Sequence, residues 1–94
     1  MIHEWYAQKK QEMPGCILLL RIGDFYEAFD ADAETVAKVC NVMTFNRKLN
    51  TGTVVMAGFP VAVLMQNLLR LRRAGYDVRT LDLADKWIEE DVDE

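Results

Sequence analysis

The stretch "CILLLRIGDFYEAF", residues 16–29, decides the fold, because it holds two short strand-like runs on either side of a turn signal. Cys16 to Ile22 is mainly apolar, and Phe25 to Phe29 is rich in aromatic residues. Between them, Gly23-Asp24 is typical of a tight turn. The stretch therefore predicts a strand, a turn and a second strand that pair as a hairpin.

Three amphipathic helices are expected around this hairpin, each indicated by apolar residues at helical spacing. The apolar residues of these helices are Ile2, Trp5, Tyr6 and Met13 in residues 2–13, then Ala33, Val36, Ala37 and Cys40, then Leu64, Leu68 and Leu71 in residues 60–74. Pro14, Asn41 and Gly75 are expected to end them. Asp30 or Asp32 is expected to cap the second helix, because a carboxylate accepts hydrogen bonds from first-turn amides. Pro60 suits the first position of the third helix, where no amide donor is needed.

Three more strands complete the predicted fold, over residues 42–45, 53–57 and 78–83. Residues 46–52 are rich in Asn, Gly and Lys/Arg, and they predict a loop between the first two of these strands. Helices interleaved with strand pairs, including one hairpin, predict an α/β (α+β) domain with a mixed β-sheet flanked by helices.

Charge is distributed unevenly along the 94 residues. Residues 1–80 contain ten Lys/Arg and eight Asp/Glu, a net charge of +2, whereas residues 81–94 contain one Lys and seven Asp/Glu, a net charge of -6. We therefore expect a domain over residues 1–83 and an acidic C-terminal tail or linker over residues 84–94. The tail either docks as a terminal helix or remains solvated.

Several classes of function lack their usual sequence signals. Two cysteines and one histidine without metal-ligand spacing predict neither a zinc site nor a disulfide framework, and reduced thiols fit a cytoplasmic location. The longest apolar run, Cys16 to Leu20, is too short to cross a bilayer. No phosphate-binding loop for ATP is present. A cluster of acids has no neighbouring Lys to complete a nuclease site; these acids are Asp24, Glu27, Asp30 and Asp32. We therefore expect no metal, no cofactor and no enzymatic activity.

Phe25 and Glu27 are the first candidate binding residues, because residues two apart on a strand share one face of a sheet. One interpretation places Phe25 and Phe29 in the core, with Glu27 at its edge. The other is a DNA-recognition pair: an aromatic ring inserted in the minor groove unstacks base steps, most readily where pairing is weak. Glu27 then accepts a hydrogen bond from a displaced base, or is protonated when burial raises its pKa.

Basic residues form two further groups. Arg47 and Lys48, in the predicted loop, are candidates for contacts with DNA phosphates. Arg70, Arg72 and Arg73 lie near a helix C-terminus, where the helix dipole favours positive charge without any ligand.

Several motifs resemble the N-terminal domain, domain I, of the MutS DNA mismatch-repair family. They are Tyr6, Lys10 and Pro14, then "LLLRIGDFYEAFDADA" at 18–33, "MAGFP" at 56–60 and "LLRLRRAGYDV" at 68–78. The resemblance implies that Phe25 stacks on a mispaired or unpaired base and that Glu27 hydrogen-bonds the same base, as a Phe-x-Glu motif. Arg47 matches a usual Arg of the family. The sequence departs from the family pattern at Thr44-Phe45-Asn46, Val61-Ala62 and Leu81-Asp82-Leu83.

The resemblance implies a binding module for mismatched or distorted double-stranded DNA, expected to be a domain or fragment of a larger protein, with a stand-alone relative as the alternative. Further domains or a partner protein could bind through the acidic tail, and no membrane is involved. The alternative is a protein-interaction or DNA-mimicking module that keeps the fold without binding mismatches. Phe25 and Glu27 together favour DNA, whereas the acidic tail favours a protein partner.

Overall fold

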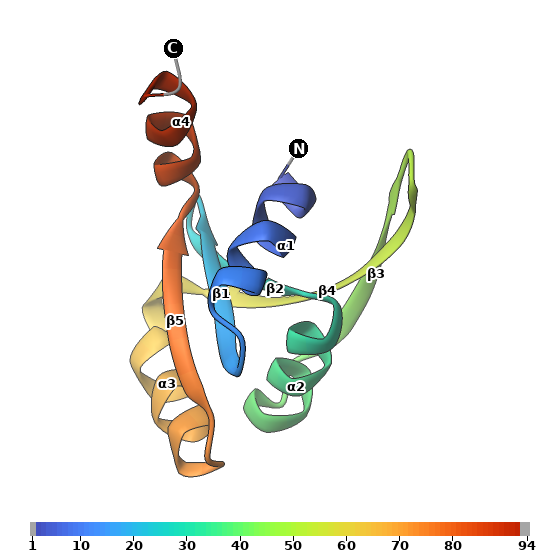
Figure 1. The fold of residues 1–94 in the computed structure, drawn as a ribbon. Helices are drawn as coiled ribbons and strands as arrows, with labels where there is room; N and C mark the ends of the chain where they lie inside the picture. Colours follow the sequence, from blue (N-terminus) through green and yellow to red (C-terminus); the bar gives the residue numbers. More distant parts are fainter. Residues whose placement is uncertain (1, 93–94) are drawn as a thin grey trace.

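The computed structural model describes residues 2–92, which form a five-stranded sheet with helices on both faces (Figure 1). The elements in chain order are α1 (Ile2–Glu12), β1 (Cys16–Ile22), β2 (Phe25–Phe29), α2 (Asp30–Cys40), β3 (Thr44–Leu49), β4 (Gly52–Pro60), the 3-10 helix η1 (Val61–Val63), α3 (Leu64–Arg73), β5 (Asp77–Asp82) and α4 (Leu83–Val92). Within the same residues, no helix combines the length and apolar composition needed to cross a bilayer.

The sheet is mixed, as the sequence predicts. Its strand order is β3-β4-β2-β1-β5. Neighbouring strands are antiparallel except for β1 and β5, which run parallel. The predicted hairpin is confirmed as β1 and β2, joined at Gly23-Asp24, where Gly23 has a positive φ of 61°. The β3–β4 hairpin extends away from the rest of the sheet (Figure 1).

Two apolar cores lie on opposite faces of the sheet. The core that includes α2 and α3 contains Ile17, Leu19, Tyr26, Ala28, Ala33, Val36, Phe59 and Leu71. The core that includes α1 contains Trp5, Tyr6, Leu18, Leu20, Phe29 and Met56. Four consecutive residues of β1, from Ile17 to Leu20, are buried because both faces of that strand are covered. The predicted apolar stripes of α1, α2 and α3 thus lie against the sheet.

The predicted loop over residues 46–52 is wrong, because β3 extends to Leu49. Arg47 and Lys48 therefore lie on a strand, opposite Val54 and Thr53 of β4. Pairing with β4 satisfies the backbone of one side of β3, and its other side is an edge of the sheet. Exposed edge strands commonly carry charged side chains, so this polar composition is compatible with a strand.

Two predictions about helix starts are also wrong. Neither Asp30 nor Asp32 caps α2, because Phe29 occupies the N-cap position and no side chain bonds the first-turn amides. Pro60 does not begin the third helix: it ends β4 in an extended conformation, and η1 separates it from α3. Asn41, in contrast, ends α2 in the expected left-handed conformation, with φ 56°.

Asp32 is buried and joins α1 to the sheet. Its carboxylate accepts hydrogen bonds from the amide of Leu18 at 3.0 Å and from Nζ of Lys10 at 2.9 Å. The hydroxyl of Tyr6 lies 3.2 Å from the same carboxylate and 2.6 Å from the carbonyl oxygen of Leu18. Burial is the main cause that raises the pKa of Tyr6 above its ordinary value. The carboxylate of Asp32 thus links α2 to α1 and β1 and does not cap the start of α2.

The acidic C-terminal segment forms α4, which contacts α1 through Glu89. Its carboxylate accepts a hydrogen bond from Nε1 of Trp5 at 2.7 Å and lies 2.5 Å from Nζ of Lys9. Of the two states left open for this segment, residues 83–92 thus adopt the docked helix. The domain boundary after residue 83 remains a prediction.

Candidate functional site

Phe25 projects from the sheet at the first position of β2. Its side chain is 49% exposed, whereas Phe29, at the last position of the same strand and on the same face, is 4% exposed. Phe29 packs beneath α1 against Tyr6, with ring centroids 4.7 Å apart. The interpretation of both rings as core is therefore right for Phe29 and wrong for Phe25.

Glu27 lies between these two rings on the same face and is half-buried. Its neighbours across the strands are Leu20 of β1 and Gly58 of β4. Burial raises the pKa of the Glu27 carboxyl, and the positive charge of Arg47 partly offsets that rise. The carboxyl group is thus positioned at the boundary of an apolar surface and water.

We expect Glu27→Gln to stabilise the fold at neutral pH. Because the folded pKa is raised above 4.5, the folded chain binds the proton more tightly than the unfolded chain, so ionised Glu27 costs stability at higher pH. The melting temperature of the variant should exceed that of the unmutated chain at pH 7, and the difference should shrink as pH falls towards 4.5. A difference that does not change with pH would contradict this assignment.

Gly58 provides the space beside Glu27. A Cβ at this position would lie 2.8 Å from the backbone oxygen of Tyr26 and 3.0 Å from Cγ of Glu27. The first of these atoms belongs to the paired strand and cannot move alone. The glycine of "MAGFP" is therefore explained by close approach of β2 and β4.

We expect Gly58→Ala to lower the free energy of unfolding by about 1–3 kcal/mol, the usual cost of an added methyl group that forces the backbone to shift. Urea denaturation would measure this change. An unfolding free energy equal to that of the unmutated chain would show that β2 and β4 separate easily.

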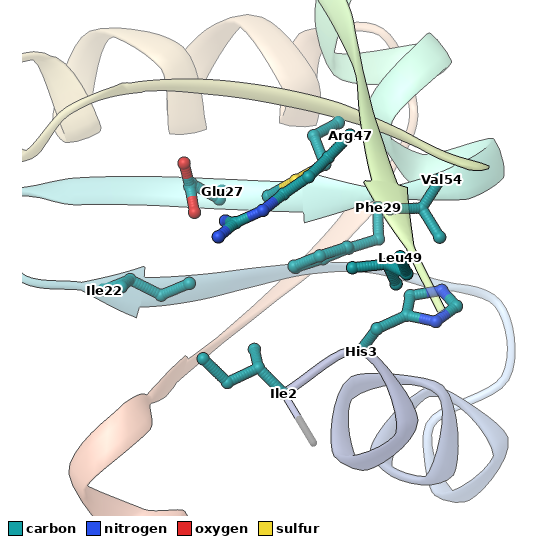
Figure 2. Close-up of a pocket in the computed structure, with 9 residues that line it drawn as sticks. Ile2, His3, Ile22, Glu27, Phe29, Arg47, Leu49 and Val54 are labelled. Atoms are coloured by element: carbon teal, nitrogen blue, oxygen red, sulfur yellow. The ribbon is translucent and has the colours of Figure 1, made fainter. Parts of the chain in front are cut away.

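A hollow of about 340 Å³ opens beside Glu27, on the face of the sheet that carries α1. Its lining residues are Ile2, His3, Ile22, Glu27, Phe29, Arg47, Leu49, Val54 and Met56. Figure 2 shows the guanidinium of Arg47 and the carboxylate of Glu27 directed into the same space, with Ile2 and Ile22 along another edge. Within the described part of the chain these two charged groups form no direct ion pair. Both remain available to a ligand.

The two predicted basic residues, Arg47 and Lys48, lie on opposite faces of β3. Arg47 shares the face of Glu27, because it is paired with Val54, which packs with Phe29. Lys48 is the next residue on the strand and therefore points to the reverse face. Arg70, Arg72 and Arg73 are further away, because α3 packs in the core on that opposite side of the sheet.

Phe45 is a candidate that the sequence did not single out. It is 48% exposed and, by its pairing with Met56, lies on the same face as Phe25, Glu27 and Arg47. Its spacing of two residues from Arg47 would have indicated this, had residues 46–49 been assigned to a strand. Among the side chains that the structure describes, no three of His, Cys, Asp or Glu are grouped to hold a metal ion.

Comparison with known proteins identifies the family of this chain. The sequence model of the family described as MutS domain I matches residues 1–90. The chain belongs to this family. A relative named DNA mismatch repair protein MutS, from Thermotoga neapolitana, is 43% identical over 79 residues, which cover 84% of this chain and 9% of the relative. Proteins of the same name from Symbiobacterium thermophilum and Methanothrix thermoacetophila are each 40% identical, over 82% and 80% of this chain.

Membership of the MutS domain I family confirms the resemblance indicated by the motifs. The chain spans about a tenth of the length of the curated MutS relatives that it matches. Within this MutS domain, Phe25, Glu27 and Arg47 lie on one face of the sheet, and Lys48 lies on the other.

Proposed function

We propose that this domain recognises mismatched or otherwise distorted duplex DNA, as part of DNA mismatch repair. Phe25 is the ring that enters the base stack, and Glu27 is the carboxyl that contacts the displaced base. The observation that carries the proposal is the half-exposed ring of Phe25 on the same face as half-buried Glu27. Family membership and the names of the relatives support the same function.

Selectivity in this proposal depends on how easily the DNA is deformed and not on its base sequence. Unstacking a base step costs a few kcal/mol, and the cost is lower where the pair is already mismatched. A ring that requires such unstacking therefore binds deformable sites best. No chemical step is needed, so the domain acts as a binding module and not as an enzyme.

The charged side chains orient the domain on the DNA and contribute only modestly to its affinity. Glu27 is repelled by phosphates, but its raised pKa favours its use close to a base, where water is excluded. Arg47 on the same face contacts a phosphate, and Lys48 adds positive charge on the reverse face of the same strand. A net charge of +2 over residues 1–80 provides few phosphate contacts, so affinity is weak and its dependence on salt is shallow.

Titration of fluorescently labelled duplexes with the chain, at low salt, tests the proposal. A duplex with one G·T mismatch and the same duplex with a paired G·C step are compared by anisotropy. We expect the mismatched duplex to bind several-fold more tightly, which corresponds to about 1 kcal/mol. Equal affinity for the two duplexes would refute the recognition role.

A further inference from the structure

Helix α3 carries apolar and basic side chains together on the side that faces away from the sheet. Met65 and Leu69 are 66% and 48% exposed, and the exposed residues Arg72 and Arg73 follow them at helical spacing. The opposite side of the helix, around Leu68, is buried in the core. Neither arginine forms an ion pair with any side chain that the structure describes. We refer to Met65, Leu69, Arg72 and Arg73 as the α3 surface.

Helix α4 carries apolar and acidic side chains on its outer side. Trp87 and Ile88 are 51% and 60% exposed, although the ammonium of Lys86 lies 4.5 Å from the centroid of the Trp87 ring. Asp85 is exposed on the same helix. Glu89 is used in docking α4 to α1, so these three side chains lie away from that contact. We refer to Asp85, Trp87 and Ile88 as the α4 surface.

The two surfaces do not meet within one chain. Strand β5, six residues long or roughly 20 Å, separates the end of α3 from the start of α4. Helix α3 packs with α2 on one face of the sheet, whereas α4 docks on α1 at the other face. In Figure 1, α4 extends beyond the C-terminal end of β5, and α3 lies beside the N-terminal part of that strand. A contact between the two surfaces therefore requires two copies of the chain.

We propose that the α3 surface binds the α4 surface of a second copy of this chain. Each surface combines exposed apolar side chains with a charge opposite to that of the other. The arginines of the α3 surface have no ion pair in their own chain, and residues 81–94, which include the α4 surface, carry a net charge of -6. Trp, Met and Arg are the residue types that interfaces favour, and complementary charge steers two surfaces together.

The contact joins two different surfaces, so the copies are arranged head to tail. Such an arrangement extends into an open chain of copies unless the rotation between neighbours closes a ring. Two short helices bury less than about 1,200 Å², which is the size of weak, transient interfaces. We therefore expect association at concentrations of roughly 0.1–1 mM.

The test uses two double variants, each of which removes one surface and keeps the other. Leu69→Glu with Arg73→Glu removes the α3 surface, and Trp87→Ala with Ile88→Lys removes the α4 surface. Phe45→Glu is the matched control, because Phe45 is 48% exposed like Leu69 but lies on β3 at the far edge of the sheet. All five native side chains are exposed, so the variants should fold, and thermal melting checks this. Sedimentation equilibrium measures the molar mass of each chain.

We expect the unmutated chain and Phe45→Glu to rise above the monomer mass of 10.8 kDa as concentration increases. Each double variant alone should remain a monomer. An equimolar mixture of the two should form a heterodimer, because the mixture retains one intact pair of surfaces. This heterodimer should weaken several-fold between 0.1 M and 1 M salt, since the Debye length falls from about 10 Å to about 3 Å.

Three results would overturn the inference. The first is an unmutated chain that remains a monomer at about 1 mM. The second is a double variant that associates by itself as strongly as the unmutated chain, because another surface, such as the edge of β5, would then join the copies. The third is a mixture of the two folded double variants that does not form the heterodimer. None of these measurements involves DNA, so none of them bears on the proposed function.

Discussion

Phe25→Ala should abolish the preference of the domain for mismatched over paired DNA. Stacking of one base on an aromatic side chain contributes about 1–3 kcal/mol, so affinity for the mismatched duplex should fall by roughly 5- to 100-fold. Affinity for the paired duplex should change little, because it depends on phosphate contacts that the ring does not make. Anisotropy titrations of both duplexes at one salt concentration measure this difference.

The chain contains a matched control for this variant. Phe45 is as exposed as Phe25, at 48% against 49%, and lies on the same face of the sheet, but it is on β3. Phe45→Ala should keep the mismatch preference, and both variants should melt close to the unmutated chain, since neither ring is buried. A mismatch preference that survives Phe25→Ala would remove the ring from the recognition step. Equal losses in the two variants would mean that general aromatic contact, rather than insertion at one position, determines binding.

Asp32→Ala should cause the largest loss of stability, about 3–5 kcal/mol, which is the usual cost of breaking a buried ion pair. The substitution leaves the amide of Leu18 and the ammonium of Lys10 without their shared acceptor. Lys10 also donates to the carbonyl oxygen of Cys16, so its charge stays close to the sheet after the carboxylate is removed. Urea denaturation followed by circular dichroism would measure the free energy of unfolding.

Asp30→Ala is the control for that experiment, because it removes a carboxylate from the same helix. Asp30 is exposed and pairs with His3, and its φ of 57° is less favourable for Ala than for Asp, so the substitution should cost about 1–2 kcal/mol, still less than the loss of Asp32. Asp32→Asn keeps the shape and one acceptor oxygen, and its effect should fall between the two. A loss for Asp32→Ala no larger than that for Asp30→Ala would show that solvent replaces the buried carboxylate.

Local signals made most of the fold predictable from the sequence. The hairpin of residues 16–29 depends on a turn between two apolar runs, and the alternation of a strand was enough to place Phe25 and Glu27 on one face. The extent of β3 was missed, because the composition of residues 46–49 is polar and only their pairing with β4 makes them a strand. Asp32 resembled a helix cap, since its real partners, such as Lys10, lie more than ten residues away in sequence.

The candidate site was predictable from the sequence only where its residues are close together in the chain. Phe25 and Glu27 belong to one strand, so their relation is local. Whether Phe25 is exposed or buried depends on the packing of α1, which covers Phe29 and leaves the start of β2 uncovered. The hollow could not be predicted, because α1, β1, β2, β3 and β4 all contribute to it.

The position of Phe25 also bears on which partner deforms in the proposed recognition of DNA. Phe25 is paired with Ile22 of β1 on one side and with Pro60 of β4 on the other. At the far end of the same strand, Phe29 is buried in the core. A force on the ring is therefore distributed over three hydrogen-bonded strands rather than absorbed by a flexible loop. In the proposed insertion of Phe25, the protein is therefore the stiff partner and the duplex the one that deforms, so the work of insertion depends on the stiffness of the DNA.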